Sequence, residues 1–506
     1  MLPKAKSVDI ILLLEGTYPY IQGGVSSWVH AIIRGFPDYR FGVVFLGSEP
    51  SAYKGVLYKL PPNLVHVETH YLHDIGRKMQ KPSGNAAMSP QVMNDLKTMH
   101  ESFLKRDSFS QGSLSFEAVI SHLMEGRVNE SHFHSSREAW NMMTSLYKER
   151  STEPSFIDYF WTVRSMHEPI WILANIARNL IEAKCYHSVS TGYAGFLGSL
   201  LSKARKKPFI LSEHGLYTKE RKIDLFHKTW AKPASDSPDG HARDGSYFRE
   251  LWIRFFEVLG KSAYACADPI VSLFEGIRLR QIEDGSTAAK TLCIPNGIDL
   301  QRFSSLREKQ ALPPKPIFAL IGRVVPIKDI KTFIRAMRKV CNRIPSAEGW
   351  IVGPTDENQS YYEECVALVQ TLELTESVKF LGFRNVTEII PQAALMILSS
   401  ISEALPLTLL EGFAAGVPAI ATNVGSCQQL IEGIKSDAED VAMGHAGRIV
   451  NIGDPESLAE AISGIYLNGP EWSKAREAGI RRVEKYYTDT IMLNSYAEIY
   501  SRSMAN

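Results

Sequence analysis

Short apolar runs alternate with helix-spaced apolar positions along the second half of the chain. The runs have the length of buried strands, and the segments between them carry apolar residues three and four positions apart. The runs are IFALIG, WIVG, VKFLG, LMILS, PAIAT and GRIV. Strands that alternate with helices in this way predict a doubly wound α/β domain built on a parallel sheet.

The first half shows the same alternation with one long interruption. Strand-like runs occupy 8–14, 41–46 and 65–69, and Ser26 or Ser27 could cap a helix that runs to about Arg34. Residues 74–169 carry apolar positions at helical spacing and predict a mainly helical insertion. A helix over 170–183 and a strand near Ser188 are expected to follow. Residues 231–246 are rich in Pro, Gly, Asp and Ser and predict a mobile loop.

Composition excludes several classes of protein. A formal net charge of +1 provides no field that would attract nucleic acid. The six cysteines form no CxxC pair, which favours a reducing compartment over a disulfide scaffold or a zinc ribbon. The apolar run at 8–14 is too short and too polar for a signal peptide, and no run has the length of a membrane span. A soluble cytoplasmic protein is therefore expected.

Two glutamates mark the junction between a predicted strand and the helix after it. Glu403 lies in the loop, and Glu411 lies about one turn inside the helix. The helix begins near Leu407 and Thr408, whose free N–H groups and positive dipole end suit a phosphate. A carboxylate at Glu411 could then accept the hydroxyls of a ribose. For Glu411 alone, an amphipathic helix with an exposed glutamate is the simpler interpretation.

Other candidates also follow strands, where ligands of open α/β sheets bind. Arg323 offers a fork of donors for phosphate oxygens and Lys328 a point charge. Taken singly, each is better explained as a solvated surface charge. The remaining candidates are Gly322, Gly353 and Phe383 in the second half, and Gly23, Gly24 and Glu213 to Gly215 in the first.

Assembled, these motifs resemble the retaining glycosyltransferases of family 4. The stretches that carry the resemblance are GRVVPIK, EALPLTLLE, PNGID and the early GGV, and it covers essentially the whole chain outside 74–169. The opening EGTYPYIQGGVSSWVH is similar to a narrower group, the PelF-type cytosolic glycosyltransferases of Pel exopolysaccharide synthesis in biofilms. The resemblance implies the GT-B fold, in which two Rossmann-like domains face a cleft. The expected domains are 1–300 and 301–484, with a C-terminal helix at about 485–506 that packs back on the first.

The resemblance also implies roles for individual residues. Glu411 would hold the ribose hydroxyls, Glu403 would contact the donor sugar, and the N–H groups of Leu407 and Thr408 would touch the phosphates. Arg323, Lys328 and the active-site histidine, His214, complete the expected catalytic set with Glu403. Gly23, Gly24, Gly322, Gly353 and Phe383 are expected to border the donor. One departure is Ala404-Leu405-Pro406, where the family often has Gly-Phe-Gly.

The expected reaction is transfer of a hexose or N-acetylhexosamine from a UDP-sugar to a growing exopolysaccharide, with the α configuration retained. The resemblance suggests a polysaccharide acceptor and leaves open recruitment to an inner-membrane synthase complex. No Asp-x-Asp motif occurs, so we expect no metal cofactor. The spacing of His66, His70 and His73 is a weak zinc signal. The alternatives are a GT-B epimerase or phosphorylase, and a non-catalytic nucleotide-sugar-binding subunit of a membrane synthase.

Overall fold

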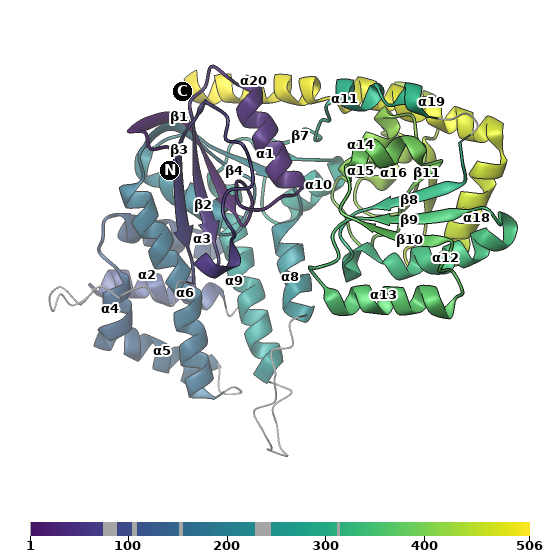
Figure 1. The fold of residues 1–506 in the computed structure, drawn as a ribbon. Coiled ribbons are helices and arrows are strands. Elements are labelled where there is room, and N and C mark those ends of the chain that lie inside the picture. Colours follow the sequence, from purple (N-terminus) through teal and green to yellow (C-terminus); the bar gives the residue numbers. More distant parts are fainter. Residues whose placement is uncertain are drawn as a thin grey trace, which may run out of the picture. The chain divides into compact units, whose positions relative to one another are not determined.

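Two parallel sheets organise the chain, one in each half (Figure 1). The computed structural model describes residues 2–505 apart from 74–88, 104–108, 151–154, 228–243 and 311–313. The chain divides into two compact units, one of Met1–Cys293 with Ala497–Asn506 and one of Ile294–Tyr496. The sequence predicts these divisions at residues 300 and 485.

The first unit contains, within its described residues, a seven-stranded parallel sheet in the order β3-β2-β1-β4-β5-β6-β7. Its strands are β1 (Ser7–Glu15), β2 (Phe41–Gly47), β3 (Leu64–Tyr71), β4 (Glu182–Ser188), β5 (Phe209–Glu213), β6 (Ile270–Ser272) and β7 (Thr291–Cys293). Its helices are α1 (Gly24–Gly35), α2 (Pro90–Ser102), α3 (Phe109–Met124), α4 (Glu130–Ser135), α5 (Arg137–Arg150), α6 (Phe156–Asn179), α7 (Tyr193–Arg205), α8 (Tyr217–His227), α9 (Asp244–Cys266) and α10 (Glu275–Glu283).

Burial on both faces explains why these segments form parallel strands. Every residue of β2 is buried, and Ile10 to Leu14 of β1 are completely so. Such strands are covered by helices on both sides. In the register of the sheet, Glu15 is opposite Leu46 and Leu13 is opposite Ser188. The loops after β1, β2 and β4 therefore leave the sheet at the same edge.

The described part of the insertion consists of helices joined by short turns, and α2 to α6 lie together (Figure 1). Its apolar side chains join the same buried cluster as those of β1, α7 and α9. The expected helix over 170–183 is wrong at both ends, because α6 begins at Phe156, passes through Pro169 and ends at Asn179. Glu182 to Cys185 alternate between exposed and buried, which is the period of a strand, and they open β4.

Two further local expectations need correction. Helix α1 begins at Gly24, with Gly23 in the capping position and no side-chain cap, so neither Ser26 nor Ser27 caps it. Ser26 is instead buried in the first turn of that helix. The expected mobile loop over 231–246 lies outside the described residues as far as residue 243, and Asp244 begins helix α9.

The second unit contains, within its described residues, a six-stranded parallel sheet in the order β10-β9-β8-β11-β12-β13. Its strands are β8 (Ile317–Ile321), β9 (Glu348–Val352), β10 (Val378–Gly382), β11 (Leu395–Leu398), β12 (Ala419–Thr422) and β13 (Gly447–Val450). Its helices are α11 (Leu300–Ser304), α12 (Ile330–Arg343), α13 (Gln359–Thr371), α14 (Val386–Ile389), α15 (Leu407–Ala414), α16 (Cys427–Glu432), α17 (Ala438–Ala442), α18 (Pro455–Leu467), α19 (Gly469–Tyr486) and the start of α20 (Asp489–Ala505). The predicted α/β class with two Rossmann-like domains is confirmed.

Helix α12 illustrates how the sequence pattern forms this layer. Its buried residues include Ile330, Phe333, Ile334, Met337 and Val340, which fall on one stripe of a helix. They pack in the same cluster as β8, β9 and β11. Among the helices of the described residues, none combines the length and apolar character that a membrane span requires.

Candidate functional site

Loops from three neighbouring strands meet at the carboxyl edge of the six-stranded sheet. The N–H of Ile401, after β11, donates to the carbonyl of Ile327, after β8, at 2.8 Å. The hydroxyl of Thr422, at the end of β12, donates to the carbonyl of Ser400 at 2.7 Å. These bonds fix the loops in the position where open α/β sheets bind their ligands.

Lys328 and Glu403 lie together at the centre of this edge. The Lys328 ammonium forms an ion pair with the Glu403 carboxylate, and the Ser400 hydroxyl donates to the same carboxylate oxygen at 2.6 Å. Both charged side chains are partly buried. A cation and an acidic group from two separate loops are thus held in one place, close to the start of the next helix.

Arg323 leaves the same loop as Lys328 but has a different partner. Its guanidinium donates to both carboxylate oxygens of Glu357, at 2.6 and 2.8 Å. Glu357 belongs to the loop after β9, which a bond of 3.0 Å from the Val324 N–H to the Pro354 carbonyl holds against the β8 loop. Both side chains of the pair are about half exposed. The structure therefore does not bring Arg323 to Glu403, although both lie at the same edge.

Helix α15 presents its start to this edge. It begins at Leu407 after Pro406, and no side chain caps it. Leu407 and Thr408 are partly exposed, so their N–H groups carry the partial positive charge of an open helix end. Glu411 lies one turn further in. Burial raises the pKa of its carboxyl to about 7, and the positive charge of Arg302 partly opposes that rise.

Two glycines allow these loops to approach one another. A Cβ atom on Gly353, where φ is +152°, would lie 2.0 Å from the carbonyl oxygen of Gly322. A Cβ atom on Gly425, where φ is +54°, would lie 2.4 Å from the carbonyl oxygen of Glu403. No other residue fits at either position. Phe383 follows β10 at the same edge with its ring largely exposed.

In the first unit, His214 follows β5 and is buried. Its ring lies 4.5 Å from that of Trp28, edge to face. Both ring nitrogens lack a hydrogen-bond partner among the described residues, and burial lowers the pKa of the imidazole to about 3. Such an imidazole is neutral at physiological pH and has both a donor and an acceptor to offer.

Glu213, the residue before His214, has a carboxylate whose hydrogen-bonding capacity is fully used. Glu213 accepts hydrogen bonds from the Thr191 hydroxyl, the Tyr217 N–H, the Tyr264 hydroxyl and the Gln281 amide, at 2.8 to 3.3 Å. Burial raises its pKa, and the four donors oppose the rise. Glu213 therefore joins the segments after β4 and β5 to α9 and α10, and it leaves no lone pair for a ligand.

The glycine pair after β1 lies at the same edge of the first unit. Gly23 and Gly24 are exposed at the start of α1. The backbone of Gly23 is extended, and a Cβ atom there would meet nothing within 4 Å. The folded chain itself does not require glycine at position 23, and open space remains beside it.

The histidines of β3 have another explanation than zinc. The Nε2 atoms of His66 and His70 each lie 2.9 Å from a carboxylate oxygen of Glu68, whose pKa falls to about 2 because of these hydrogen bonds. The Ala5 N–H occupies the other ring nitrogen of His66. Over the described residues, no group of three or more His, Cys, Asp or Glu side chains is arranged to hold a metal ion.

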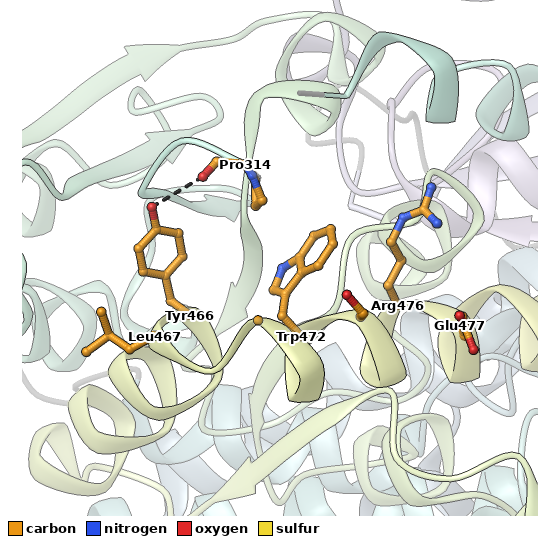
Figure 2. A pocket seen from close by; sticks show the side chains of 8 residues that line it. Pro314, Tyr466, Leu467, Trp472, Arg476 and Glu477 are labelled. Carbon is orange, nitrogen blue, oxygen red and sulfur yellow. Dashed lines mark hydrogen bonds between the residues drawn. The ribbon is translucent and has the colours of Figure 1, made fainter. Parts of the chain in front are cut away.

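A pocket of about 560 Å³ opens elsewhere in the second unit (Figure 2). Tyr466, Trp472 and Arg476 line it from α18 and α19, and the Tyr466 hydroxyl donates to the Pro314 carbonyl at 3.2 Å. The Trp472 indole donates to the carbonyl of Ala394 at 2.8 Å. Pro314 and Ala394 precede β8 and β11, so this pocket lies at the amino edge of the sheet, away from Lys328 and Glu403.

Comparison with known proteins places the chain in a family. Residues 8–289 match the model described as "Domain of unknown function (DUF3492)", which covers more than half of the chain. The chain belongs to the DUF3492 family. Residues 303–482 of this DUF3492 chain also match the model "Glycosyl transferases group 1".

Curated relatives match parts of the DUF3492 chain. It is 36% identical over 184 residues to "Exopolysaccharide phosphotransferase SCO2592" of Streptomyces coelicolor, which covers 35% of this chain and 17% of that protein. It is 25% identical over 266 residues to "D-inositol 3-phosphate glycosyltransferase" of Streptomyces griseus, covering 50% of this chain and 52% of the relative. The DUF3492 chain thus spans about half or less of the length of either relative.

Solved structures resemble the whole DUF3492 chain. Anabaena Alr3699/HepE in complex with UDP matches with a TM-score of 0.58 and 15% identity, over 98% of this chain and 100% of that one. Sucrose-phosphate synthase from Thermosynechococcus elongatus matches with a TM-score of 0.58 and 16% identity, over 98% and 99%. At these identities the likeness concerns the fold, and it confirms the predicted GT-B architecture.

The sequence motifs do not indicate the partners of the candidate residues. Glu357, which pairs with Arg323, comes from a segment that carries no motif, and Arg302, which acts on Glu411, lies three residues after the PNGID stretch. Ser400 could have been found, since it lies three residues before Glu403 in the same loop. The donors around Glu213 come from four separate segments, and no spacing in the sequence predicts them.

Proposed function

We propose that this DUF3492 protein is a retaining glycosyltransferase that moves a hexose or N-acetylhexosamine from a UDP-sugar to a growing exopolysaccharide. The observation that carries the proposal is the ion pair of Lys328 and Glu403 beside the uncapped start of α15, with Glu411 one turn inside the helix. Positive charge, open N–H groups and two acidic side chains at one sheet edge suit a diphosphate flanked by two sugars.

The parts of the donor then have separate partners. The diphosphate lies at the N–H groups of Leu407 and Thr408, and Glu411 accepts the ribose hydroxyls. Glu403 turns from Lys328 to the hydroxyls of the transferred sugar. Gly322 and Gly353 let the backbone of the β8 and β9 loops approach the nucleotide, and Phe383 borders it. Gly23 and Gly24 supply a backbone that a sugar can approach closely.

In the proposed reaction, the bond from the anomeric carbon to the diphosphate oxygen breaks while a bond to the acceptor hydroxyl forms on the same face. The acceptor proton passes to the departing diphosphate oxygen. Lys328, and Arg323 once it leaves Glu357, stabilise the charge that grows on the diphosphate. His214 stays neutral and offers hydrogen bonds to the sugar. The two cations do the work of a metal, so a chelating agent should leave turnover unchanged.

The acceptor and partners are the finer part of the proposal. The relative from Streptomyces coelicolor carries exopolysaccharide in its name, and the opening EGTYPYIQGGVSSWVH is similar to the PelF type. We therefore place the chain in a Pel-type pathway of biofilm polysaccharide, in the cytoplasm, with a polysaccharide acceptor and an inner-membrane synthase complex as partner.

A thermal-shift panel followed by a transfer assay tests this proposal. UDP and UDP-hexoses should raise the melting temperature of the purified chain, whereas ADP and GDP at the same concentration should not. The UDP-sugar that gives the largest shift should then release UDP in the presence of oligosaccharide acceptors, and the product should have an α linkage. Equal shifts from all nucleotides, or UDP-sugar consumed only by inversion of the free donor, would contradict a UDP-dependent transferase.

A further inference from the structure

A short turn between β2 and β3 exposes aliphatic side chains. Val56 and Leu57 are both exposed, and so is Ile21 from the loop after β1. The Leu57 N–H donates to the carbonyl of Pro19 at 2.9 Å, which holds the two loops together. We call residues 53–59 with Ile21 the β2–β3 tip. It lies beyond the carboxyl end of β2, at the same sheet edge as Glu15.

Tyrosines anchor the tip and fix which side chains point outward. The Tyr53 hydroxyl accepts a hydrogen bond from the Ser48 N–H at 3.1 Å, and its ring lies 5.1 Å from that of Phe45. The ring of Tyr58 lies 4.9 Å from that of Tyr18, which is completely buried. With both tyrosines turned toward the sheet, the aliphatic side chains between them face solvent.

Two lysines flank the exposed aliphatic pair. Lys54 and Lys59 are exposed, and neither forms an ion pair with any residue that the structure describes. A Cβ atom on Gly55, between Lys54 and Val56, would meet nothing within 4 Å, so the turn projects into open space. The tip therefore combines apolar side chains with positive charge that no described residue neutralises in an ion pair.

We propose that the β2–β3 tip docks this protein on an anionic lipid surface. Aliphatic side chains can enter the boundary between headgroups and acyl chains while neighbouring ammonium groups remain among the anionic headgroups. Each lysine near such a surface strengthens binding about fivefold. Docking requires no sugar transfer, so a test of docking does not depend on whether the proposed activity is correct. It would bring the carboxyl edge of the seven-stranded sheet close to the membrane.

The chain provides a matched control at Leu279. Leu279 of α10 is 50% exposed and Leu57 is 49% exposed, so the two leucines present nearly equal areas. Arg278 and Arg280 flank Leu279, but Arg278 pairs with Glu275, and Arg280 pairs with Glu283 and Asp284. Leu279 thus has the apolar exposure of the tip without its net positive charge.

Co-sedimentation of the full chain with vesicles tests the proposal. Wild-type protein should bind vesicles of phosphatidylcholine with one third phosphatidylglycerol, and binding to phosphatidylcholine alone should be at least tenfold weaker. The double variant Val56→Gln with Leu57→Gln should bind the mixed vesicles about tenfold more weakly. The double variant Lys54→Gln with Lys59→Gln should bind the mixed vesicles about twentyfold more weakly. Most of its remaining binding should no longer depend on salt concentration.

Leu279→Gln should bind like wild type, and thermal unfolding should show that all variants are folded. Absence of wild-type binding to the mixed vesicles would overturn the proposal, as would equal binding to neutral vesicles. Equal losses in Leu279→Gln and in the tip variants would overturn it as well, because exposure alone would then explain the binding.

Discussion

The carboxyl edges of the two sheets carry acidic residues in opposite situations. In the first unit, Glu213 is buried and accepts four hydrogen bonds, two on each carboxylate oxygen. In the second unit, the Lys328 ammonium and the Ser400 hydroxyl both donate to one carboxylate oxygen of Glu403, and Glu357 pairs with Arg323 where both side chains are about half exposed.

We infer that this difference separates a carboxylate that supports the fold from carboxylates that can bind a ligand. A carboxylate whose lone pairs are all occupied fixes the loops around it, whereas a half-exposed ion pair such as Arg323 with Glu357 can exchange its partner for a ligand at small cost. We infer that the six-stranded edge binds the charged donor. The seven-stranded edge positions a neutral imidazole, His214, whose nitrogens lack partners among the described residues.

The largest expected difference between the units is in their stability at low pH. Burial lowers the pKa of His100, His187 and His214 to about 3 and that of His167 to about 4, below the ordinary value of 6.5. The folded first unit then binds fewer protons than the unfolded chain below pH 6.5. Its stability is complete above that pH and falls as the pH decreases toward 4, by about 2 to 3 kcal/mol per histidine.

The second unit should resist acid better, because its single histidine, His445, is exposed. Its Glu411 acts in the opposite direction, since a carboxyl pKa raised to about 7 makes the folded state more stable as the pH falls from 7 toward 4.5. Hydrogen exchange between pH 7 and 4 should show protection lost first in the first unit. Earlier loss in the second unit would contradict this comparison.

The next effect concerns the cation at the binding edge. Lys328→Ala should lower turnover by about 10² to 10³, the usual loss when a preorganised charge no longer stabilises a leaving group. Lys331→Ala is the matched control, because Lys331 lies three residues further on and pairs with Glu364 at the surface. Rates of UDP release measure both. Similar rates for Lys328→Ala and wild type would remove the leaving-group role.

Glu411 allows a test by binding alone. Glu411→Ala should weaken UDP binding by about 10- to 100-fold, the loss of hydrogen bonds to a charged group. Because ribose hydroxyls donate to the ionised carboxylate and the pKa in the free protein is about 7, wild-type affinity should rise about tenfold from pH 6 to pH 8. Calorimetry should show that the UDP affinity of Glu411→Gln no longer changes with pH. If the affinity of this variant still changed with pH, the titrating group would be another residue.

The smallest expected effect comes from removing the charge of Glu357, the ion-pair partner of Arg323. Glu357→Gln should leave folding unchanged and tighten UDP binding by about two- to fivefold at low salt, because an exposed ion pair contributes up to about 1 kcal/mol. The gain should disappear at high ionic strength. Weaker binding in Glu357→Gln would show that Glu357 positions Arg323 for the ligand instead of competing with it.

The sequence predicted what depends on local pattern. Apolar runs of strand length predicted the strands of both sheets, and the 3.6-residue period predicted α12. The pattern at 394–425 predicted Glu403 in the loop between β11 and α15 and Glu411 inside α15. The error at 170–183 arose where the expected border of the insertion at 169 falls inside α6, whose buried side chains on both sides of Pro169 join one core cluster. The pairings Arg323 with Glu357 and Glu213 with its four donors depend on contacts between distant segments, which no spacing along the chain encodes.

Hydrogen exchange with and without UDP tests the central claim most directly, because it locates the bound nucleotide on the chain. If the six-stranded edge binds the donor, UDP should slow exchange in peptides that contain 322–328 and 403–411, while peptides around the α18–α19 pocket, including Trp472, should not change. Protection confined to that pocket, or UDP binding without protection at Leu407 and Thr408, would contradict the assignment.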